Sequence, residues 1–341
     1  MTRRWGKTST LKDIAYTIDN ILIEQIVFST LIPMVDRYND LEGVDWRGML
    51  CEDDDETLRE FKILAQDKMR QLGPHSTPRM MGENKGTYVE FTDQYGEAVG
   101  YDIEFAKYKK ANDWIDQMAE AIERDKRRIR FELLREMLNP QSYGRGYWNQ
   151  TFDSNAGITA PPNYGVNTFT ASHTHYNTTG AATITNLDFF LDGMQHIQEH
   201  GVVNGDFKIF MNSSDILQVM KIAAWVGTGR ANVANVTTNK FSDTGLWGSF
   251  DLMGARFITE DYVPAGYVLI LGATNRQKPI KFHQSNNPQY RGLMWLPGPN
   301  TGRPWYDSHV RREFRVRTFH RWQGSVYQIS TNSAYTAPSD Y

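Results

Sequence analysis

The sequence predicts an α+β protein built from elongated elements. Residues 102–138 contain no glycine or proline and carry apolar side chains at three- and four-residue steps, which predicts one very long helix. Residues 76–101 hold two short β-prone runs around a polar turn, which predicts an extended hairpin. From residue 247 onward the chain is mostly β-prone, so a β-rich part closes the sequence.

The composition narrows the class of protein. The chain has 341 residues, of which 40% are hydrophobic and 23% charged, and its net charge of −3 argues against a general polyanion binder. Cys51 is the single cysteine, so no intrachain disulfide is expected. The most apolar run, residues 20–35, is too short to span a bilayer, and no membrane partner is expected.

Two helices are predicted before the hairpin. Apolar side chains recur with helical spacing over residues 10–32, within an N-terminal arm, and Pro33 is expected to end this run. Residues 53–72 open with four acids, which complement a helix dipole, and continue in strong helix formers. Gly73 and Pro74 should stop this second helix.

The hairpin has few residues that could form a core of its own. Its first strand is predicted to contain Tyr88, Val89 and Phe91, its turn to span residues 93–96, and its second strand residues 98–103. An isolated two-stranded hairpin is only marginally stable in water. We therefore expect the hairpin to lie on another surface, with a neighbouring subunit as the candidate.

The long helix is the clearest element of the sequence. It should end at Asn139 and Pro140, and at 1.5 Å per residue it would be roughly 50 Å long. A helix of that length is more typical of a strut than of a compact domain. A coiled coil is the rival interpretation, but Lys126 falls on the apolar stripe.

The second half of the chain mixes loops, helices and strands. Residues 141–185 are rich in Gly, Asn and Thr and predict loops. Helices are predicted at residues 186–200 and 213–225, with a strand at residues 206–212 between them. The tract 226–245 is polar and should form loops.

Residues 196–200 read HIQEH, the inverted zinc-protease pattern. In that pattern His196 and His200 would share one Zn²⁺, with Glu199 as general base. On a helix, however, these three side chains fall on the face opposite the apolar residues. No third ligand is evident downstream, so the motif is predicted to be a solvated helix face and not a metal site.

No other stretch predicts catalytic chemistry. His173 and His175 lie in a Thr/Asn-rich loop without acidic or cysteine neighbours, and they are not predicted to bind metal. The lone GTGR at residues 227–230 follows a helix and not a strand, so it fails the context of a dinucleotide-binding loop. We therefore expect no catalytic residue and no cofactor.

Two basic stretches allow opposite interpretations. RREFRVRTFHR, residues 311–321, holds five arginines, and RDKRRIR, residues 124–130, holds five basic groups. On a strand, Arg311, Arg315 and Arg317 share one side. These groups form either salt bridges between elements or subunits, or sequence-independent contacts with phosphates. The small net charge favours salt bridges, so we expect interfaces first and DNA second.

The order of elements resembles the major capsid proteins of tailed bacteriophages, which have the Hong Kong 97 fold. The stretch TPRMMGENKGTYVEFTDQYGEAVGYDIEF, leading into the long helix, is similar to the E-loop and spine helix of that family. DLMGARFITEDYVPAGYVLILGA is similar to a segment in which a strand, a P-x-G turn and an apolar strand follow each other. HVRREFRVRTFHRWQGSVYQIS is similar to the closing strands. The resemblance covers about residues 50–330.

The resemblance implies a division into peripheral and axial domains. Some members of the family begin with a long helical scaffolding segment that a protease removes. Here the arm is short and starts at Met1, so scaffolding is expected from a separate protein or not at all. The implied units are the N-terminal arm (1–50), a peripheral-domain helix (51–75), the E-loop hairpin (76–101), the spine helix (102–140), the axial domain (141–276), peripheral-domain strands (277–318) and an axial-domain closing strand with the C-terminus (319–341).

The function implied by the resemblance is structural and not catalytic. The chain would assemble into hexamers and pentamers of an icosahedral shell around double-stranded DNA, in a virion assembled in the cytoplasm of a bacterial host. Scaffolding, portal and decoration proteins are candidate partners. The expected subunit-interface residues are Lys85, Tyr88, Phe91, Tyr95, Arg311, Arg315 and Arg317, and the expected capsomer-centre residues are Gly227, Gly229, Arg230 and Gly245.

Two alternatives stay open at this point. One is a cellular nanocompartment shell of the same fold, which encloses enzymes instead of DNA. The other is a zinc hydrolase that uses His196, Glu199 and His200.

Overall fold

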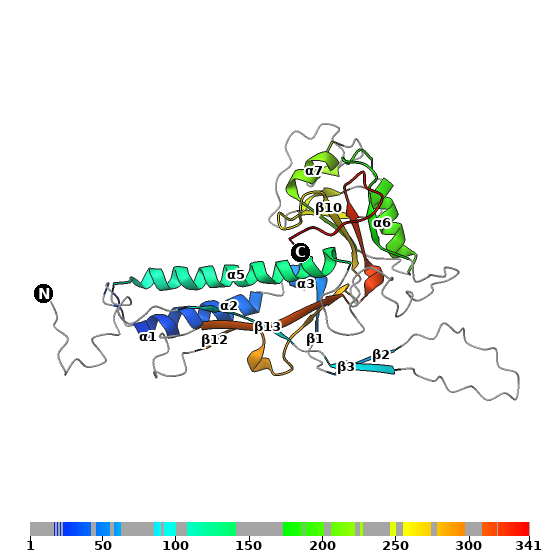
Figure 1. Cartoon of the computed structure of the whole chain (residues 1–341). Coiled ribbons are helices and arrows are strands. Elements are labelled where there is room, and N and C mark those ends of the chain that lie inside the picture. Colours follow the sequence, from blue (N-terminus) through cyan, green and yellow to red (C-terminus); the bar gives the residue numbers. More distant parts are fainter. Residues whose placement is uncertain are drawn as a thin grey trace, which may run out of the picture.

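The computed structural model describes the principal helices and strands of the chain. The described residues are 17, 19, 21, 23–41, 46–54, 58–62, 85–89, 92–99, 108–140, 173–186, 188–200, 206–221, 226–227, 246–249, 255–273, 278–296, 309–318 and 320–340. Figure 1 shows an elongated arrangement. A layer that contains the helices α2 and α5 and the strands β12 and β13 extends to the left, and a sheet that contains β10 and is covered by α6 and α7 stands at the right end of this layer.

Helix α5 (Ala111–Leu138) confirms the long helix, although it begins later than the sequence predicted. Lys110 has an extended backbone, and its N–H donates to Asp113 Oδ2 at 2.9 Å, which closes the first turn. The residues just before it are not helical, and Tyr108 is 65% exposed instead of lying on the buried stripe. The predicted start at residue 102 is therefore wrong for the described part of that segment.

The N-terminal helix runs further than predicted. Its parts are α1 (Ile23–Ile26), the π-helical turn η2 (Val27–Leu31) and α2 (Ile32–Leu41), and the short α3 (Trp46–Leu50) follows. The helix continues through Pro33, which was expected to end it. A widened turn stands directly before the proline, with the Ile32 N–H bonded to Val27 O, and relieves the clash that a proline ring makes with the preceding turn.

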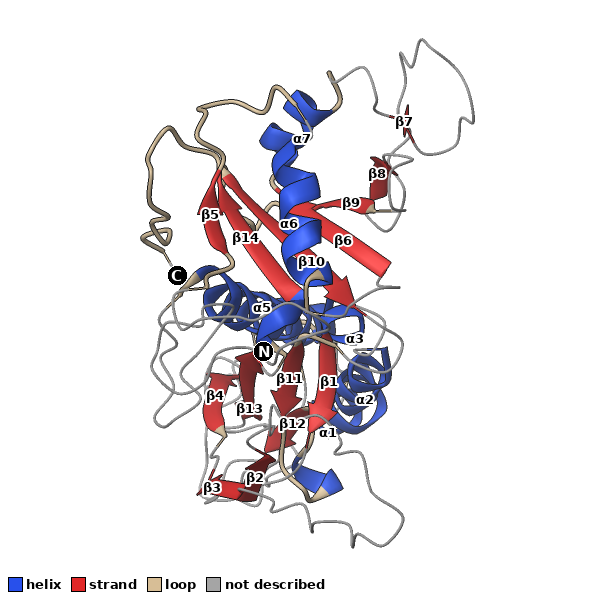
Figure 2. Ribbon diagram, turned by 90° about the vertical axis from the view of Figure 1, so that its right-hand side faces the viewer, coloured by secondary structure: helices blue, strands red, loops and turns tan. Residues whose placement is uncertain are grey.

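A seven-stranded sheet forms one end of the molecule, with the strand order β5-β14-β10-β6-β9-β8-β7 (Figure 2). Its strands are β5 (Tyr176–Thr178), β6 (Asp206–Met211), β7 (Val226–Gly227), β8 (Leu246–Ser249), β9 (Arg256–Thr259), β10 (Tyr267–Ala273) and β14 (Gly324–Gln328). Helices α6 (Asp188–Gln198) and α7 (Ser213–Val219) confirm the two predicted helices, with shorter limits.

Helix α6 lies very close to this sheet. At Gly193 a Cβ atom would come within 2.5 Å of Ile270 Cδ1 and 2.9 Å of Tyr327 Cε2, so glycine permits the close approach. Phe190, Met194 and Ile197 of α6 are buried in the apolar core that the sheet and both helices share. The opposite face of the sheet packs on the C-terminal half of α5.

A five-stranded sheet lies along α5. Its strands are β1 (Cys51–Asp54), β4 (Asp93–Ala98), β11 (Ile280–His283), β12 (Leu293–Leu296) and β13 (His309–Thr318). The strand β13 is central, because β4, β11 and β12 all pair with it antiparallel, while β1 pairs parallel with β11. In Figure 2 the order across the sheet is β4, β13, β11 and β1.

The third sheet has only two strands. β2 (Leu58–Lys62) and β3 (Lys85–Val89) pair antiparallel, and among the described strands each pairs only with the other. In Figure 1 this pair lies apart from the seven-stranded sheet.

Two predictions for this region are wrong. The described residues of 51–62 form strands and not the predicted helix, because pairing with β11 and with β3 overrides the local preference of the acidic run for a helix start. Residues 63–84 lie outside the described part. The predicted hairpin turn, residues 93–96, lies inside β4, so β3 pairs with β2 and not with the strand that follows it.

Candidate assembly interface

The strand β4 offers an edge to other molecules. Among the described strands it pairs only with β13, and all its side chains except that of Tyr95 are exposed. An open hollow of about 420 Å³ lies between β4 and α5, lined by residues of both and by Leu293 and Val310. An exposed strand edge presents unpaired backbone groups, which makes it a template for pairing with another chain.

Tyr95 is the one predicted interface aromatic whose side chain the structure describes. Its ring lies 4.9 Å from that of Phe314, and the Arg128 guanidinium lies 4.4 Å from its centroid. Its hydroxyl donates to Glu132 Oε1 at 3.2 Å, and burial raises the pKa of this phenol. Tyr95 is therefore fixed to α5 and β13 within its own chain before any neighbour is added.

The strand β13 alternates between two environments. Arg311 and Arg315 are half-buried, as the parity of a strand predicts, but Arg317 is buried. Arg311 forms an ion pair with Glu313, and Arg315 Nε lies 3.9 Å from Asp93 Oδ2. Both predicted interface arginines at the half-buried positions thus have partners inside the chain.

Arg312, which the sequence analysis did not single out, is the most deeply buried charge of β13. Its side chain has no exposed surface, and its Nε lies 2.9 Å from Asp125 Oδ2 on α5. The Tyr38 hydroxyl of α2 donates to the same oxygen at 2.9 Å. This group of three side chains ties α2, α5 and β13 together. One signal was available, since Arg312 shares its strand parity with the apolar Val310, Phe314 and Val316.

Glu136 carries a perturbed carboxyl group at the other end of α5. Its Oε1 accepts the backbone N–H of Thr318 at 3.0 Å. Burial raises the pKa of Glu136 to about 7, although that hydrogen bond and the nearby Arg317 oppose the shift.

The basic run 124–130 forms ion pairs along α5. Arg124 lies 2.6 Å from Glu120, Lys126 lies 2.6 Å from Glu123, and Arg124 also pairs with Glu97 of β4. These contacts bear out the salt-bridge interpretation for those two side chains. Because all are partly exposed, each contributes little to stability.

Large apolar side chains are exposed on several elements. They are Ile21, Phe28, Leu41, Tyr108, Leu217 and Tyr290, and each is between 37% and 65% exposed. Single exposed apolar residues are ordinary in a folded chain, and each of these side chains could be buried further against another chain.

The remaining predicted residues are not tested by side-chain geometry. Lys85 and Tyr88 lie in the strand β3, and Gly227 lies in β7. Phe91, Gly229, Arg230 and Gly245 lie outside the described residues. Their proposed roles stay predictions.

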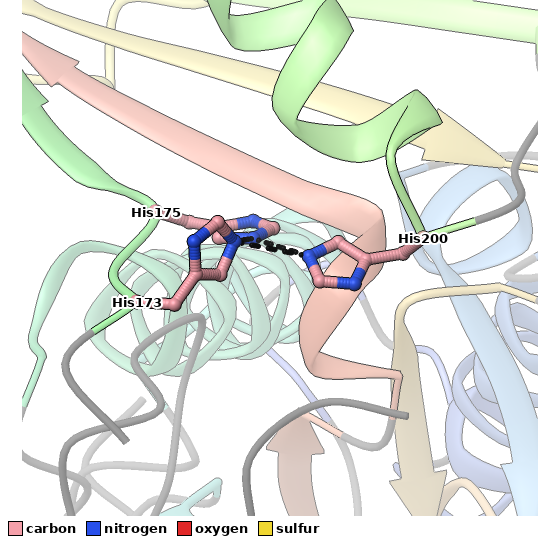
Figure 3. A group of neighbouring side chains, drawn as sticks. All are labelled: His173, His175 and His200. Carbon is pink, nitrogen blue, oxygen red and sulfur yellow. Dashed lines mark hydrogen bonds between the residues drawn. The ribbon is translucent and has the colours of Figure 1, made fainter. Parts of the chain in front are cut away.

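The histidines of the HIQEH motif are not arranged as predicted. His200 is buried, and with His173 and His175 it forms a group whose ring nitrogens converge (Figure 3). The helical-wheel argument fails for His200 because α6 ends at Gln198 and the two following residues form a turn. The convergent group is thus not the pair His196 and His200 that a zinc protease of this pattern requires.

Comparison with known proteins identifies the fold. No protein-family model and no curated protein matches the chain. A solved structure from Mycobacterium phage Patience superposes with a TM-score of 0.64 at 18% identity, covering 96% of this chain and 94% of that one. The capsid structure of the cyanophage P-SCSP1u gives a TM-score of 0.51 at 8% identity, covering 83% and 87%. An encapsulin complex from Synechococcus elongatus gives 0.45 at 14% identity, covering 87% and 92%.

The chain therefore has the Hong Kong 97 fold, the fold of tailed-phage capsid proteins, as its resemblance to that family predicted. The mixed α+β architecture is confirmed as well. Within the described residues, no helix combines the length and the apolar character needed to cross a membrane.

Proposed function

We propose that this chain is a major capsid protein, a structural subunit and not an enzyme. It assembles into hexamers and pentamers that close an icosahedral shell around double-stranded DNA. The observation that carries the proposal is the match over nearly the full length of both chains to a structure from Mycobacterium phage Patience, with a TM-score of 0.64. The match to a cyanophage capsid supports it.

The surfaces of the single chain suit a protein that is completed by copies of itself. The β4 edge and the exposed apolar side chains Phe28 and Leu41 of the N-terminal helices offer area that the chain does not cover in its described part. The strands β2 and β3 pair with no further strand among the described residues. Each contact can be weak, because a shell subunit makes several contacts at once and their effects multiply.

The two larger sheets support the proposed axial and peripheral domains. The seven-stranded sheet gathers strands between Tyr176 and Ala273 and adds β14 from the C-terminal part, which fits an axial domain with a closing strand. The five-stranded sheet gathers β1, β4, β11, β12 and β13 along α5, which fits a peripheral domain. In this assignment the tract 226–245 lies at the capsomer centre.

The packaged DNA is contacted weakly and without sequence preference. The chain has a net charge of −3. Acidic partners are present for Arg311, Arg312 and Arg315 of β13 and for Arg124 and Lys126 of α5. Phosphate contacts are therefore few and sensitive to salt. Scaffolding, portal and decoration proteins are the further partners, and the shell forms in the cytoplasm of a bacterial host.

Replacing three arginines tests whether β13 serves interfaces or DNA. The variant combines Arg311→Gln, Arg315→Gln and Arg317→Gln, with Arg127→Gln on the exposed face of α5 as the control. We expect the triple variant, once its isolated subunit is shown to be folded by circular dichroism, to form fewer empty shells than the control. Normal empty shells that retain less DNA would reject the interface role and favour phosphate contact.

The nucleic-acid content of purified particles separates a phage capsid from a nanocompartment. Particles from infected cells should contain double-stranded DNA that resists nuclease until the shell is opened. Particles that contain packaged enzymes and no DNA would contradict the proposed cargo, while leaving the fold and the self-assembly intact.

A further inference from the structure

Four of the eight histidines of the chain gather at one end of the seven-stranded sheet. Three of them form a tight triangle of Nε2 atoms. His173 lies 3.1 Å from His175 and 3.1 Å from His200, and His175 lies 3.0 Å from His200 (Figure 3). His196 of the last turn of α6 lies outside this triangle, with its ring centroid about 6 Å from those of His173 and His175.

Hydrogen bonds alone cannot satisfy this triangle. Each Nε2 either carries a proton and donates, or has a lone pair and accepts. Three mutually contacting nitrogens with only two possible states must include at least one pair in the same state. That pair is either two N–H groups or two lone pairs that face each other. A cation at the centre removes the conflict, because all three nitrogens then present lone pairs to it.

The surroundings favour the lone-pair state. His175 Nδ1 lies 2.6 Å from the carbonyl oxygen of Gly324, which can only accept, so Nδ1 carries the proton and Nε2 is left as an acceptor or ligand. A backbone carbonyl in this place is the usual outer partner of a metal-binding histidine.

The backbone holds two of the ligands in place. The carbonyl oxygen of His175 accepts the N–H of Val326 at 2.8 Å, so this residue is joined to β14 of the sheet. His200 follows the C-terminal end of α6, where the helix dipole is negative and favours a cation. Two separate segments therefore present ligands from fixed positions.

We propose that His173, His175 and His200 bind one late first-row divalent cation, with Zn²⁺ as the expected ion. Three neutral imidazoles are a donor set that suits zinc. A Zn²⁺ ion about 2.0–2.1 Å from each nitrogen would sit roughly 1 Å out of their plane and leave a fourth position for water or another ligand. The ion clamps the segment before β5 to the end of α6.

This site differs from the zinc-protease pattern in the sequence. It uses His200 of that pattern but takes its other two ligands from His173 and His175, which lie 27 and 25 residues earlier. Its role is to stabilise the end of the seven-stranded sheet. The inference stands on the geometry of the chain and is independent of the proposed capsid function.

Metal analysis of the purified chain is the first test. The protein is freed of metal with EDTA, titrated with ZnCl₂, passed through a desalting column and analysed by elemental mass spectrometry. We expect about one Zn²⁺ per chain for the wild type. Titration with CoCl₂ should give the visible absorption bands of tetrahedrally bound Co²⁺. A wild-type chain that retains no zinc and shows no Co²⁺ bands would overturn the proposal.

Substitutions show whether these three histidines are the ligands. His175→Gln and His200→Gln should each weaken Zn²⁺ binding by more than the roughly 10–100-fold expected for losing an outer partner. His309→Gln on β13 is the matched control and should bind as the wild type does. Unchanged affinity in both ligand variants would reject the assignment.

Thermal unfolding separates loss of a ligand from loss of the fold. In EDTA, both variants and the wild type should have similar Tm values. With free Zn²⁺ at a hundred times its Kd, the Tm of the wild type should rise by roughly 5 °C, and those of the variants should not. His196→Gln should keep this shift, and its loss there would place the metal on the HIQEH pair instead.

Discussion

The seven-stranded sheet and the two-stranded sheet differ in what each has to pack against. The larger sheet is covered by α6 and α7 on one face and by the C-terminal half of α5 on the other, and buried apolar side chains fill both interfaces. The pair β2–β3 has five paired positions and no further strand among the described residues. The seven-stranded sheet therefore has a hydrophobic core of its own. An isolated two-stranded sheet such as β2–β3 is only marginally stable in water, so it is expected to need a partner surface.

This difference separates two sources of stability in the molecule. The sheets joined by α5 should set the free energy of unfolding of the isolated subunit, because they bury the apolar surface. The two-stranded sheet should contribute little to that free energy and much to association. Substitutions in the two parts are therefore expected to affect different measurements.

The largest effect is expected from removing the two-stranded sheet. Residues 55–92 are replaced by a ten-residue Gly/Ser linker. Asp54 and Asp93 are separated by three strand spacings, about 14 Å at ~4.8 Å each, and such a linker spans about 17 Å on average. We expect a folded subunit with an unchanged Tm that forms no closed shells, as judged by electron microscopy. Normal particles would show that β2–β3 is dispensable for assembly.

The next effect concerns the buried ion pair between β13 and α5. Arg312→Ala leaves the Asp125 carboxylate buried without its cation and should cost about 3–5 kcal/mol of unfolding free energy. Urea denaturation of the isolated subunit measures this loss, with Arg311→Ala as the control, since its pair with Glu313 is half-buried. Equal losses in the two variants would contradict the role assigned to Arg312.

A smaller effect is expected where α6 touches its sheet. Gly193→Ala places a methyl group against Ile270 and Tyr327, and overpacking of this kind costs about 1–3 kcal/mol. The exposed Gln195→Ala on the same helix is the control and should change stability by less than about 0.5 kcal/mol. The comparison fails if Gly193→Ala alters shell closure without altering the stability of the subunit.

The smallest effect is a dependence of stability on pH from Glu136. Its folded pKa of about 7 is raised above the ordinary value of 4.5, so the folded state holds the proton more tightly. Its contribution is complete below pH 4.5 and is lost as the pH rises to 7. Burial raises this pKa, but Glu136 as a whole keeps part of its surface exposed, so we expect a loss of roughly 1–2 kcal/mol.

Glu136→Gln keeps an oxygen that can accept the Thr318 N–H but cannot ionise. Urea denaturation at pH 5 and pH 8 should show a smaller decrease for this variant than for the wild type. Parallel decreases would mean that Glu136 does not titrate in this range.

Patterns of neighbouring residues predicted the elements that depend mainly on interactions between residues close in sequence. The long helix follows from apolar side chains at three- and four-residue steps, and only its start was misplaced, because Lys110 is extended and Asp113 closes the first turn. Helix α6 and strand β6 were placed nearly correctly for the same reason.

Pairing between distant segments was not predictable from local patterns. The acids at residues 53–56 suit a helix start, yet β1 and β2 are strands because β11 and β3 lie beside them. The predicted pairing within the hairpin is wrong, because β3 pairs with β2, and β4 pairs with β13, which lies more than 200 residues later in the chain. These errors did not change the order of the main elements along the chain, and this order is what indicated the Hong Kong 97 fold.

The candidate site was predictable only in part. Strand parity predicted one shared side for Arg311, Arg315 and Arg317, of which Arg311 and Arg315 are half-buried and Arg317 is buried. Parity alone did not single out Arg312, whose importance depends on Asp125 and Tyr38 from two other elements. The three convergent histidines were judged separately as a loop pair and a helix motif. Only the folded chain brings these two segments together.

Self-assembly is the central claim, and electron microscopy of the purified chain tests it most directly. The protein is expressed alone, fractionated by size-exclusion chromatography, and the earliest fraction is imaged in negative stain. The account predicts closed shells of uniform diameter and megadalton mass. A chain that elutes only as a folded monomer or dimer, and forms no shells or capsomers at high subunit concentration, would contradict it.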